Sequence, residues 1–152
     1  MPESRFWSKV DQTGTCWLWT AYVHPSGYGQ FYWNGRQTYA HRASYEIAHG
    51  PIPAGMEIDH RATCPRNCVR PEHLRLATRK QNVENRTGAQ TNSKSGVRGV
   101  RWNKCSWVAE VKHHGVLIHV GRFPTLAEAE VAVIAKRNEL FTHNDLDRMT
   151  NV

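Results

Sequence analysis

The sequence predicts an α+β protein built from two small modules. Residues 16–56 alternate short aromatic runs with turn signals and then change to a helical pattern. The polar stretch from Thr87 has small residues and no apolar period, which is typical of a linker. Three extended runs and one capped helix follow it. We therefore expect domains at 1–88 and 96–152, joined by a linker at 89–95.

The first module is expected to open with short strands. Trp17 and Trp19 alternate along one predicted strand, and the Asn34-Gly35 pair is a strong hairpin signal. Over residues 40–49 the apolar pattern becomes helical, and a Gly-Pro pair ends it. A sheet made largely of aromatic residues needs a partner to bury one face. The segment that follows the helix is the expected partner.

The stretch 57–86 holds the residues for phosphodiester hydrolysis, which requires a base and a cation. His60 can be the base, because its unperturbed pKa lies near neutrality. Asp59 can ligate a metal ion, since adjacent strand residues point to opposite sides. Asn82 can add a neutral oxygen to the same ion. Mg²⁺, or Mn²⁺ in its place, takes few protein oxygens and leaves room for phosphate.

A second ligand set lies inside this stretch. Cys64, Cys68 and His73 have the close spacing of metal ligands, and Cys16 could supply a fourth. A Cys₃His set would form a tetrahedral structural zinc site that orders the loop. The alternative is that these cysteines are reduced and merely packed.

The Asp-His pair and the segments CWLWTA, GYGQF, YAHRASYE, GPIPAGMEIDH and CVRPEHLRLAT resemble the HNH endonucleases, particularly the phage and intron-encoded homing group. The resemblance covers nearly all of residues 16–86. It implies a ββα-metal fold, in which a hairpin and a helix grip one metal ion. His60 falls on the general-base position, and Asp59 and Asn82 on metal-ligand positions. His73 falls on the central catalytic position that orders the loop, where the family usually has Asn; Asn82 stands where His is frequent.

The second module is expected to be a three-stranded sheet packed on one helix. The extended runs are at 97–102, 106–112 and 116–120. Thr125 and Glu128 form a capping box that opens a helix ending near residue 141. One face of this helix is apolar and suited to packing on the sheet: Leu126, Ala129, Ala132, Val133 and Leu140.

The segments SGVRGVRW, WVAEVK and HVGRFPTLAEAEVA resemble the plant ethylene-response-factor DNA-binding domain over residues 95–141. The resemblance implies that the sheet lies in the major groove. Arginine can bond guanine bidentately and glutamate can accept from cytosine. The positions that match DNA readers, or are further candidates for DNA contact, are Arg98, Arg101, Lys104, Glu110, Lys112 and His119, with Arg79 and Lys80 in the first module.

Charge supports a polyanionic partner. The formal net charge is +7, and residues 91–123 carry six Lys/Arg against Glu110 alone. An ordinary solvated basic surface is the alternative. No apolar run approaches the roughly 18 residues of a membrane span, and the N-terminus lacks the apolar core of a signal peptide. We expect a soluble protein in the cytoplasm of a bacterial or phage-infected cell, on double-stranded DNA and without a membrane partner.

These observations together predict a metal-dependent DNA endonuclease of the HNH homing type, acting at a specific sequence. A monomer carries one catalytic centre and should nick one strand, unless dimerisation brings a second. The main rival is a non-catalytic DNA-binding regulator that uses a zinc-stabilised HNH scaffold. A structure-specific or RNA-directed nuclease is a second rival.

Overall fold

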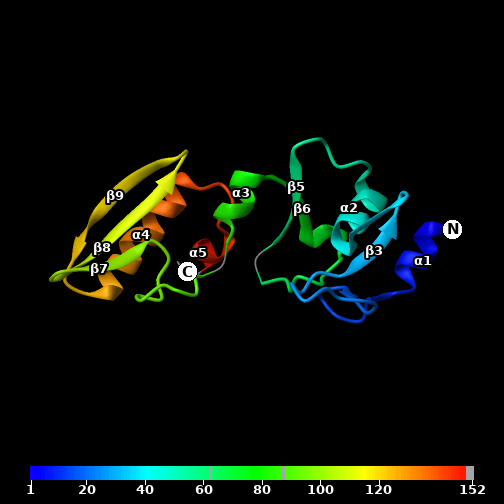
Figure 1. The fold of residues 1–152 in the computed structure, drawn as a ribbon, viewed down its shortest axis with the longest axis horizontal. Coiled ribbons are helices and arrows are strands. Elements are labelled where there is room, and N and C mark those ends of the chain that lie inside the picture. The colour runs from blue at the N-terminus through cyan, green and yellow to red at the C-terminus, as the bar shows by residue number, and fades with distance from the viewer. Residues whose placement is uncertain (62, 87, 150–152) are drawn as a thin grey trace. The chain divides into compact units, whose positions relative to one another are not determined.

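A computed structural model describes residues 1–61, 63–86 and 88–149 of the chain (Figure 1). The chain divides into two compact units, Met1–Asn82 and Val83–Val152. The division falls six residues before the predicted end of the nuclease domain at 88 and assigns the predicted linker to the second unit. Thr87 and residues 150–152, which belong to the predicted segments, lie outside the described residues.

The first unit consists of three antiparallel two-stranded sheets and short helices. Its elements are α1 (Pro2–Trp7), β1 (Val10–Asp11), β2 (Leu18–Trp19), β3 (Gln30–Trp33), β4 (Arg36–Tyr39), α2 (Ala40–His49), β5 (Met56–His60), η1 (Pro71–His73), β6 (Leu74–Thr78) and α3 (Arg79–Glu84), whose last two residues fall in the second unit. The pairs are β1–β2, β3–β4 and β5–β6.

Local signals place the β3–β4 hairpin and α2 where the sequence predicts them. Asn34 and Gly35 both have positive φ, at 49° and 79°, as a two-residue hairpin turn requires. Helix α2 covers Ala40–His49, and Gly50 follows it with a φ of 87°. Glycine ends the helix here because it alone adopts this conformation without strain.

Aromatic side chains form the core of the first unit. Phe6, Trp19 and Phe31 are buried against one another, with ring centroids 5.1–5.5 Å apart. Val69, from the segment after β5, joins this core and confirms that the segment helps to bury the aromatic sheet. Phe6 comes from α1, a helix that the sequence patterns did not indicate.

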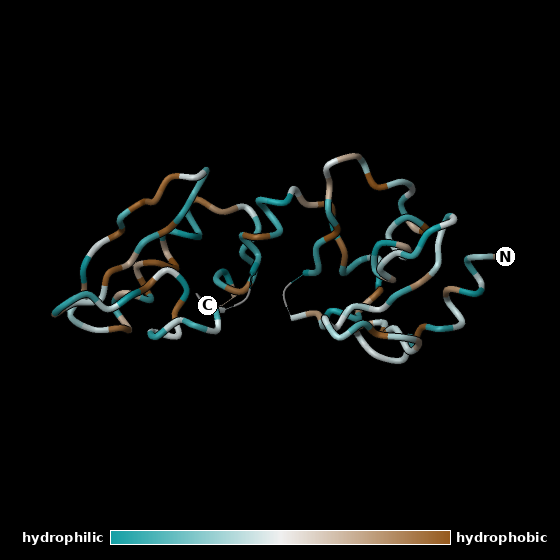
Figure 2. Tube along the Cα trace, in the orientation of Figure 1, coloured by the Kyte–Doolittle hydropathy of each residue, from teal (hydrophilic) through white to brown (hydrophobic). Residues whose placement is uncertain are grey.

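The second unit is a three-stranded antiparallel sheet packed on a helix, as predicted. Its elements are β7 (Val100–Asn103), β8 (Ser106–His113), β9 (Val116–Phe123), α4 (Leu126–Leu140) and α5 (Asp145–Met149), and the sheet order is β7-β8-β9. The capping box of Thr125 and Glu128 is present at the start of α4. Figure 2 shows hydrophobic residues recurring between hydrophilic ones along the sheet.

The core of the second unit lies between the sheet and α4. Val100, Ala109 and Val111 from the strands pack against Ala129 and Val133 of the helix. A bulge between residues 109 and 110 shifts the register of β8 with β9. Of the predicted apolar face, only Ala129 and Val133 are fully buried, and the other three residues are half-buried.

A glycine allows the chain to approach this bulge closely. Gly99 has a φ of +81°, and a Cβ added there would lie 2.5 Å from the carbonyl oxygen of Glu110. The Gly99 carbonyl accepts a hydrogen bond from the Glu110 amide at 2.8 Å. Any side chain at this position would therefore push β7 away from β8.

A buried arginine also belongs to the helix face. Arg137 donates to the Asp147 carboxylate from Nε and Nη2, at 2.6 and 2.9 Å, and to the carbonyl of Arg98. This ion pair ties α5 to α4. Among the described helices, none has the length and apolar character that a membrane span needs.

Candidate active site and metal centre

The candidate site is built on β5, β6 and α3, the hairpin-and-helix arrangement that the HNH resemblance implied (Figure 1). In the β5–β6 register, Asp59 lies opposite Arg75 and His60 lies opposite Leu74. Asn82 follows on α3. Two clusters of chemically different side chains surround this framework, one with sulfur and nitrogen donors and one with oxygen donors.

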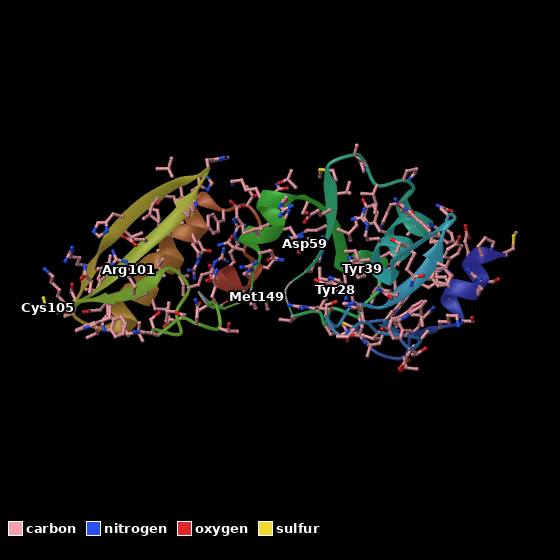
Figure 3. All side chains as sticks on the ribbon, in the orientation of Figure 1. Tyr28, Tyr39, Asp59, Arg101, Cys105 and Met149 are labelled. Atoms are coloured by element: carbon pink, nitrogen blue, oxygen red, sulfur yellow. The ribbon has the colours of Figure 1, made fainter. Side chains whose placement is uncertain are left out.

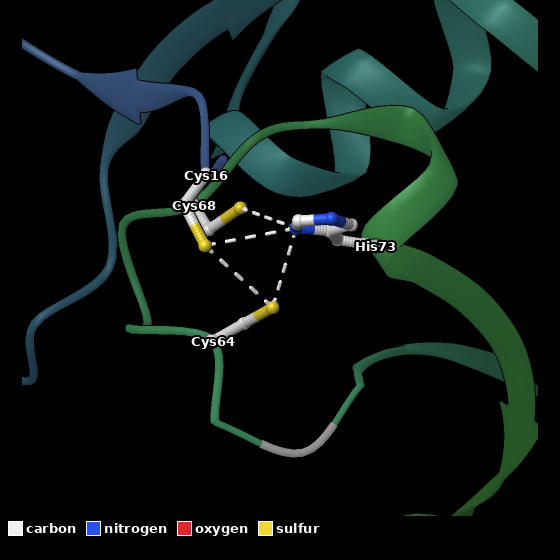
Figure 4. Close-up of side chains that lie close together, drawn as sticks. All are labelled: Cys16, Cys64, Cys68 and His73. Atoms are coloured by element: carbon white, nitrogen blue, oxygen red, sulfur yellow. Dashed lines mark hydrogen bonds between the residues drawn. The ribbon is translucent and has the colours of Figure 1, made fainter. Parts of the chain in front are cut away.

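The first cluster, the soft-donor cluster, consists of Cys16, Cys64, Cys68 and His73 (Figure 4). The Nδ1 atom of His73 lies 3.6, 3.4 and 3.7 Å from the sulfurs of Cys16, Cys64 and Cys68. The sulfurs of Cys16 and Cys64 are 3.8 Å apart. All four ligand atoms lie within 4.8 Å of one another.

These separations fit a tetrahedral zinc ion. Bonds of about 2.3 Å to sulfur and about 2.0 Å to nitrogen, directed at tetrahedral angles, place ligand atoms roughly 3.5–3.8 Å apart. Four of the six separations lie at 3.4–3.8 Å, and all six lie within 4.8 Å. The structure therefore brings together the four residues of the predicted zinc site, with the spacing that a metal ion of this kind needs.

Strand contacts bring Cys16 to the other three residues. Leu18 forms an isolated bridge with Cys68, and the amide of Trp19 donates to the carbonyl of Asn67 at 2.9 Å. The amide of Val69 donates to the Trp17 carbonyl at 2.8 Å. Backbone pairing between segments about fifty residues apart in the sequence thus places Cys16 beside the other three ligands.

The thiols of the soft-donor cluster would need a bound metal ion to lose their protons at neutral pH. Burial, together with the neighbouring Cys16 and Cys68, raises the pKa of the Cys64 thiol to about 12. Burial likewise raises the pKa of Cys68. These thiols are protonated at neutral pH by themselves, whereas a divalent ion at their centre would stabilise the thiolates that bind it.

The second cluster, the oxygen-donor face, consists of Glu57, Asp59 and Asn82. Glu57 and Asp59 are two residues apart on β5 and therefore share one face of the hairpin. The Asn82 Nδ2 donates to Glu57 Oε2 at 2.5 Å. Asp59 is buried and accepts from Nε and Nη2 of Arg75, at 3.1 and 3.0 Å. Glu57 is the member that sequence reasoning missed; its position two residues before Asp59 on a predicted strand was the available signal.

His60 points to the opposite side of β5, as the sequence predicted. Its Nε2 donates to the backbone carbonyl of Cys68 at 2.9 Å. The ring packs against His41, with centroids 4.9 Å apart, and lies 6.1 Å from the ring of Tyr28. Burial lowers the pKa of His60, although the Cys68 carbonyl and Asp59 partly offset it. The imidazole is therefore neutral at neutral pH and able to accept a proton.

Arg98 lies in a structural position within the second unit. Its guanidinium donates from Nη1 to the carbonyls of Glu84 and Arg86, each at 2.9 Å, and from Nη2 to that of Val83. It also lies 5.6 Å over the ring of Phe141. These contacts hold the chain before the sheet against the helix end. They favour a structural role over the predicted role in reading DNA.

The remaining predicted DNA contacts in the second unit lie on the sheet face that α4 does not cover. Arg101, labelled in Figure 3, is exposed on β7. Its Nε bonds the Glu110 carboxylate on the next strand at 3.2 Å. His119 faces the same carboxylate at 3.8 Å. Lys112 is exposed further along β8, and Lys104 is exposed in the β7–β8 turn.

Three more basic residues are candidates for DNA contact: the predicted Arg79 and Lys80, and the additional Arg122. Arg79 is exposed at the start of α3, and Lys80 is half-buried beside it. Arg122 is exposed on β9, opposite Val108 in the register, and extends the row that Arg101 begins. The sequence analysis missed Arg122. Simple strand alternation would put it on the opposite sheet face from His119, and only the bulge brings both residues to the same face.

Comparison with known proteins finds similarity over part of the chain. Residues 38–84 match the family model described as HNH endonuclease. Protein 7.7 of Escherichia phage T7 is 41% identical over 69 residues, which cover 45% of this chain and 52% of that protein. Protein 3.8 of the same phage is 40% identical over 77 residues, covering 51% and 60%. The chain thus spans little more than half the length of these relatives, and no solved structure matches it.

Proposed function

We propose that this protein is a metal-dependent DNA endonuclease of the HNH homing type. The observation that carries the proposal is the ββα framework within residues 38–84, which match the HNH endonuclease family. This framework carries an acid, a histidine and an amide of the kinds that such chemistry needs: Asp59, His60 and Asn82. The expected products carry 5′-phosphate and 3′-hydroxyl ends.

His60 is the general base in this proposal. Because the Nε2–H group donates a hydrogen bond to the Cys68 carbonyl, Nδ1 is the ring atom that takes the proton from water. The carbonyl also fixes the orientation of the ring. The lowered pKa keeps the imidazole in its neutral form, so the base is ready at neutral pH.

Asp59 and Asn82 would hold the divalent ion. Their carboxylate and amide oxygens are hard donors, which suit Mg²⁺ or Mn²⁺. Bound there, the ion supplies positive charge for the phosphate and the leaving oxygen. Arg75 holds the Asp59 carboxylate in place from the opposite strand.

The soft-donor cluster would hold a structural zinc ion. Cys68 belongs to the cluster through its sulfur and holds His60 through its carbonyl. With a metal ion held there, Cys68 would therefore fix the loop that orients the base. In this arrangement His73 acts through the loop, at the position where the HNH family usually has asparagine.

The second unit would bind double-stranded DNA through the outer face of its sheet, like the ethylene-response-factor domain. Arg101, Lys104, Lys112 and Arg122 supply cations for phosphates and base edges, and Glu110 and His119 supply polar contacts. Arg79 and Lys80 would hold phosphates near the site. A monomer with one such centre nicks one strand in the cytoplasm of a phage-infected cell.

Cleavage of supercoiled plasmid with Mg²⁺ tests the proposal, with wild type compared with His60→Ala. Open-circle product from wild type alone supports a nicking nuclease, and linear product points to paired active sites. If neither protein cuts several phage DNAs in Mg²⁺ or Mn²⁺, the chain is a DNA-binding regulator and the proposal is wrong.

A further inference from the structure

We infer that Glu57 is a positioning residue that decides which atom of the Asn82 amide meets the metal ion. The inference rests on the proposed nuclease function and concerns a residue to which neither the sequence patterns nor the family match assigns a role. It starts from one contact: the Asn82 Nδ2 donates to Glu57 Oε2 at 2.5 Å.

An amide has two different ends, and only one of them binds a cation. The carbonyl oxygen is a metal ligand, whereas the NH₂ group is a donor and repels a cation. The two ends are similar in size, so an unrestrained asparagine can present either one. A carboxylate accepts hydrogen bonds but donates none when ionised. Glu57 therefore takes the NH₂ end of Asn82 and turns Oδ1 away from itself.

The hairpin holds the second proposed ligand in a comparable way. Asp59 is fixed by Arg75, which lies directly across in the β5–β6 register. Glu57 lies opposite Ala77, which is small and fully buried. Each proposed metal ligand thus contacts a hairpin residue that can set its orientation. Such partners of ligands typically change metal affinity or activity about 10–100-fold when they are removed.

The same contact separates positioning from direct ligation. Replacing Glu57 with glutamine removes the charge but keeps an oxygen that can accept from Asn82 Nδ2. Replacing it with leucine removes both. A positioning role therefore predicts that Glu57→Gln keeps most of the metal binding and Glu57→Leu does not, whereas a direct ligand would lose most of its affinity already in Glu57→Gln, because the anionic charge is gone.

The first experiment measures Mn²⁺ binding to the full-length protein by electron paramagnetic resonance. All variants carry His60→Ala, so that the proposed base is absent and the same proteins can also be tested with uncut DNA. We expect Glu57→Leu to weaken Mn²⁺ binding about 10–100-fold and Glu57→Gln to weaken it several-fold less. Plasmid nicking by the same substitutions in the wild-type background should require correspondingly more Mg²⁺ for half-maximal rate. Zinc content and thermal unfolding report whether the first unit stays folded.

Glu72→Gln is the matched control. Glu72 is an exposed glutamate of the same unit whose carboxylate bonds Arg70 on the surface. Removing its charge should leave Mn²⁺ binding and the Mg²⁺ requirement unchanged.

A substitution of Asn82 provides the second test. Histidine at this position can donate one ring N–H to Glu57 and offer its other nitrogen to the ion, an arrangement common in metal sites. We expect Asn82→His to bind Mn²⁺, and to lose most of that binding when combined with Glu57→Leu.

The outcomes separate the inference from the proposed function. Mn²⁺ affinity that is unchanged in Glu57→Leu, or equal losses in the leucine and glutamine variants, would overturn the positioning role while wild-type cleavage stands. Wild-type protein that neither binds Mn²⁺ nor cuts DNA would instead remove the nuclease proposal. If Glu57→Leu fails to fold, Glu57→Gln decides the question: a loss of Mn²⁺ affinity well below tenfold supports the positioning role, and a loss of tenfold or more overturns it.

Discussion

The first unit contains two clusters of potential ligands whose chemistry differs. The soft-donor cluster brings three sulfurs and one nitrogen within 4.8 Å of one another, enough ligands for a tetrahedral site without water or substrate. The oxygen-donor face offers few protein oxygens, which leaves coordination positions for water and phosphate. A closed set of ligands suits a structural ion, whereas an open set suits one that must meet a substrate.

Cys68 links the soft-donor cluster to the proposed general base. Cys68 contributes its sulfur to the soft-donor cluster, and its carbonyl holds the ring of His60. A substitution in the soft-donor cluster should therefore also lower DNA cleavage. Loss of a metal ion from the oxygen-donor face should leave the fold intact.

The largest expected effect, on both stability and cleavage, comes from a substitution in the soft-donor cluster. Cys64→Ser should lower the zinc content from one equivalent to none and lower the unfolding temperature sharply, because metal binding supplies folding free energy at such sites. DNA cleavage should fall with it. Elemental analysis and calorimetry measure these changes, and Cys105→Ser is the control, because Cys105 is exposed and outside the cluster. Equal zinc in both variants would refute the assignment.

The second largest effect is expected from the proposed general base, His60. His60→Ala should reduce single-turnover cleavage by about 10²–10⁴-fold, because general-base catalysis contributes this much. Zinc content and DNA affinity, measured by elemental analysis and a mobility-shift assay, should stay near those of the wild type. A parallel loss of zinc would mean that the histidine supports the closed cluster instead.

A smaller effect is expected in the second unit, whose sheet carries binding but no proposed chemistry. Arg101→Ala should weaken specific DNA binding by about 1–3 kcal/mol if the side chain reads a base. Lys136→Ala removes a cation from α4, which covers the other sheet face, and should change specific binding little. Footprinting and a shift assay compare the two. Unchanged target preference in Arg101→Ala would remove the reader assignment.

The smallest effect concerns the helix that supports this sheet. Thr125→Ala removes the hydroxyl that accepts from the Glu128 amide and should lower stability by about 0.5–2 kcal/mol. Chemical denaturation monitored by circular dichroism measures the loss. Cleavage of non-specific DNA should be unaffected, since the helix lies outside the unit that carries the site; a large loss would show that the two units depend on each other.

Local patterns predicted most of the framework. The Asn34-Gly35 turn and the capping box at Thr125 depend on atoms within a few residues of one another. The short spacing of Cys64, Cys68 and His73 likewise indicated a ligand set, although the fourth member could only be suggested. The contacts of Arg98 with the carbonyls of Glu84 and Arg86 could not be predicted in this way, because they join residues 12 or more positions apart across the predicted linker.

By itself, the sequence determined the α+β class, the two clusters of ligand types and the position of the histidine beside an acid, since these depend on residue identity and local spacing. Only the tertiary structure decided that Cys16 reaches the cluster through the pairing of Leu18 with Cys68. Only the tertiary structure placed Glu57 against Asn82. These contacts join residues 25 or more positions apart, and such partners are chosen by the packing of whole elements, which no local pattern contains.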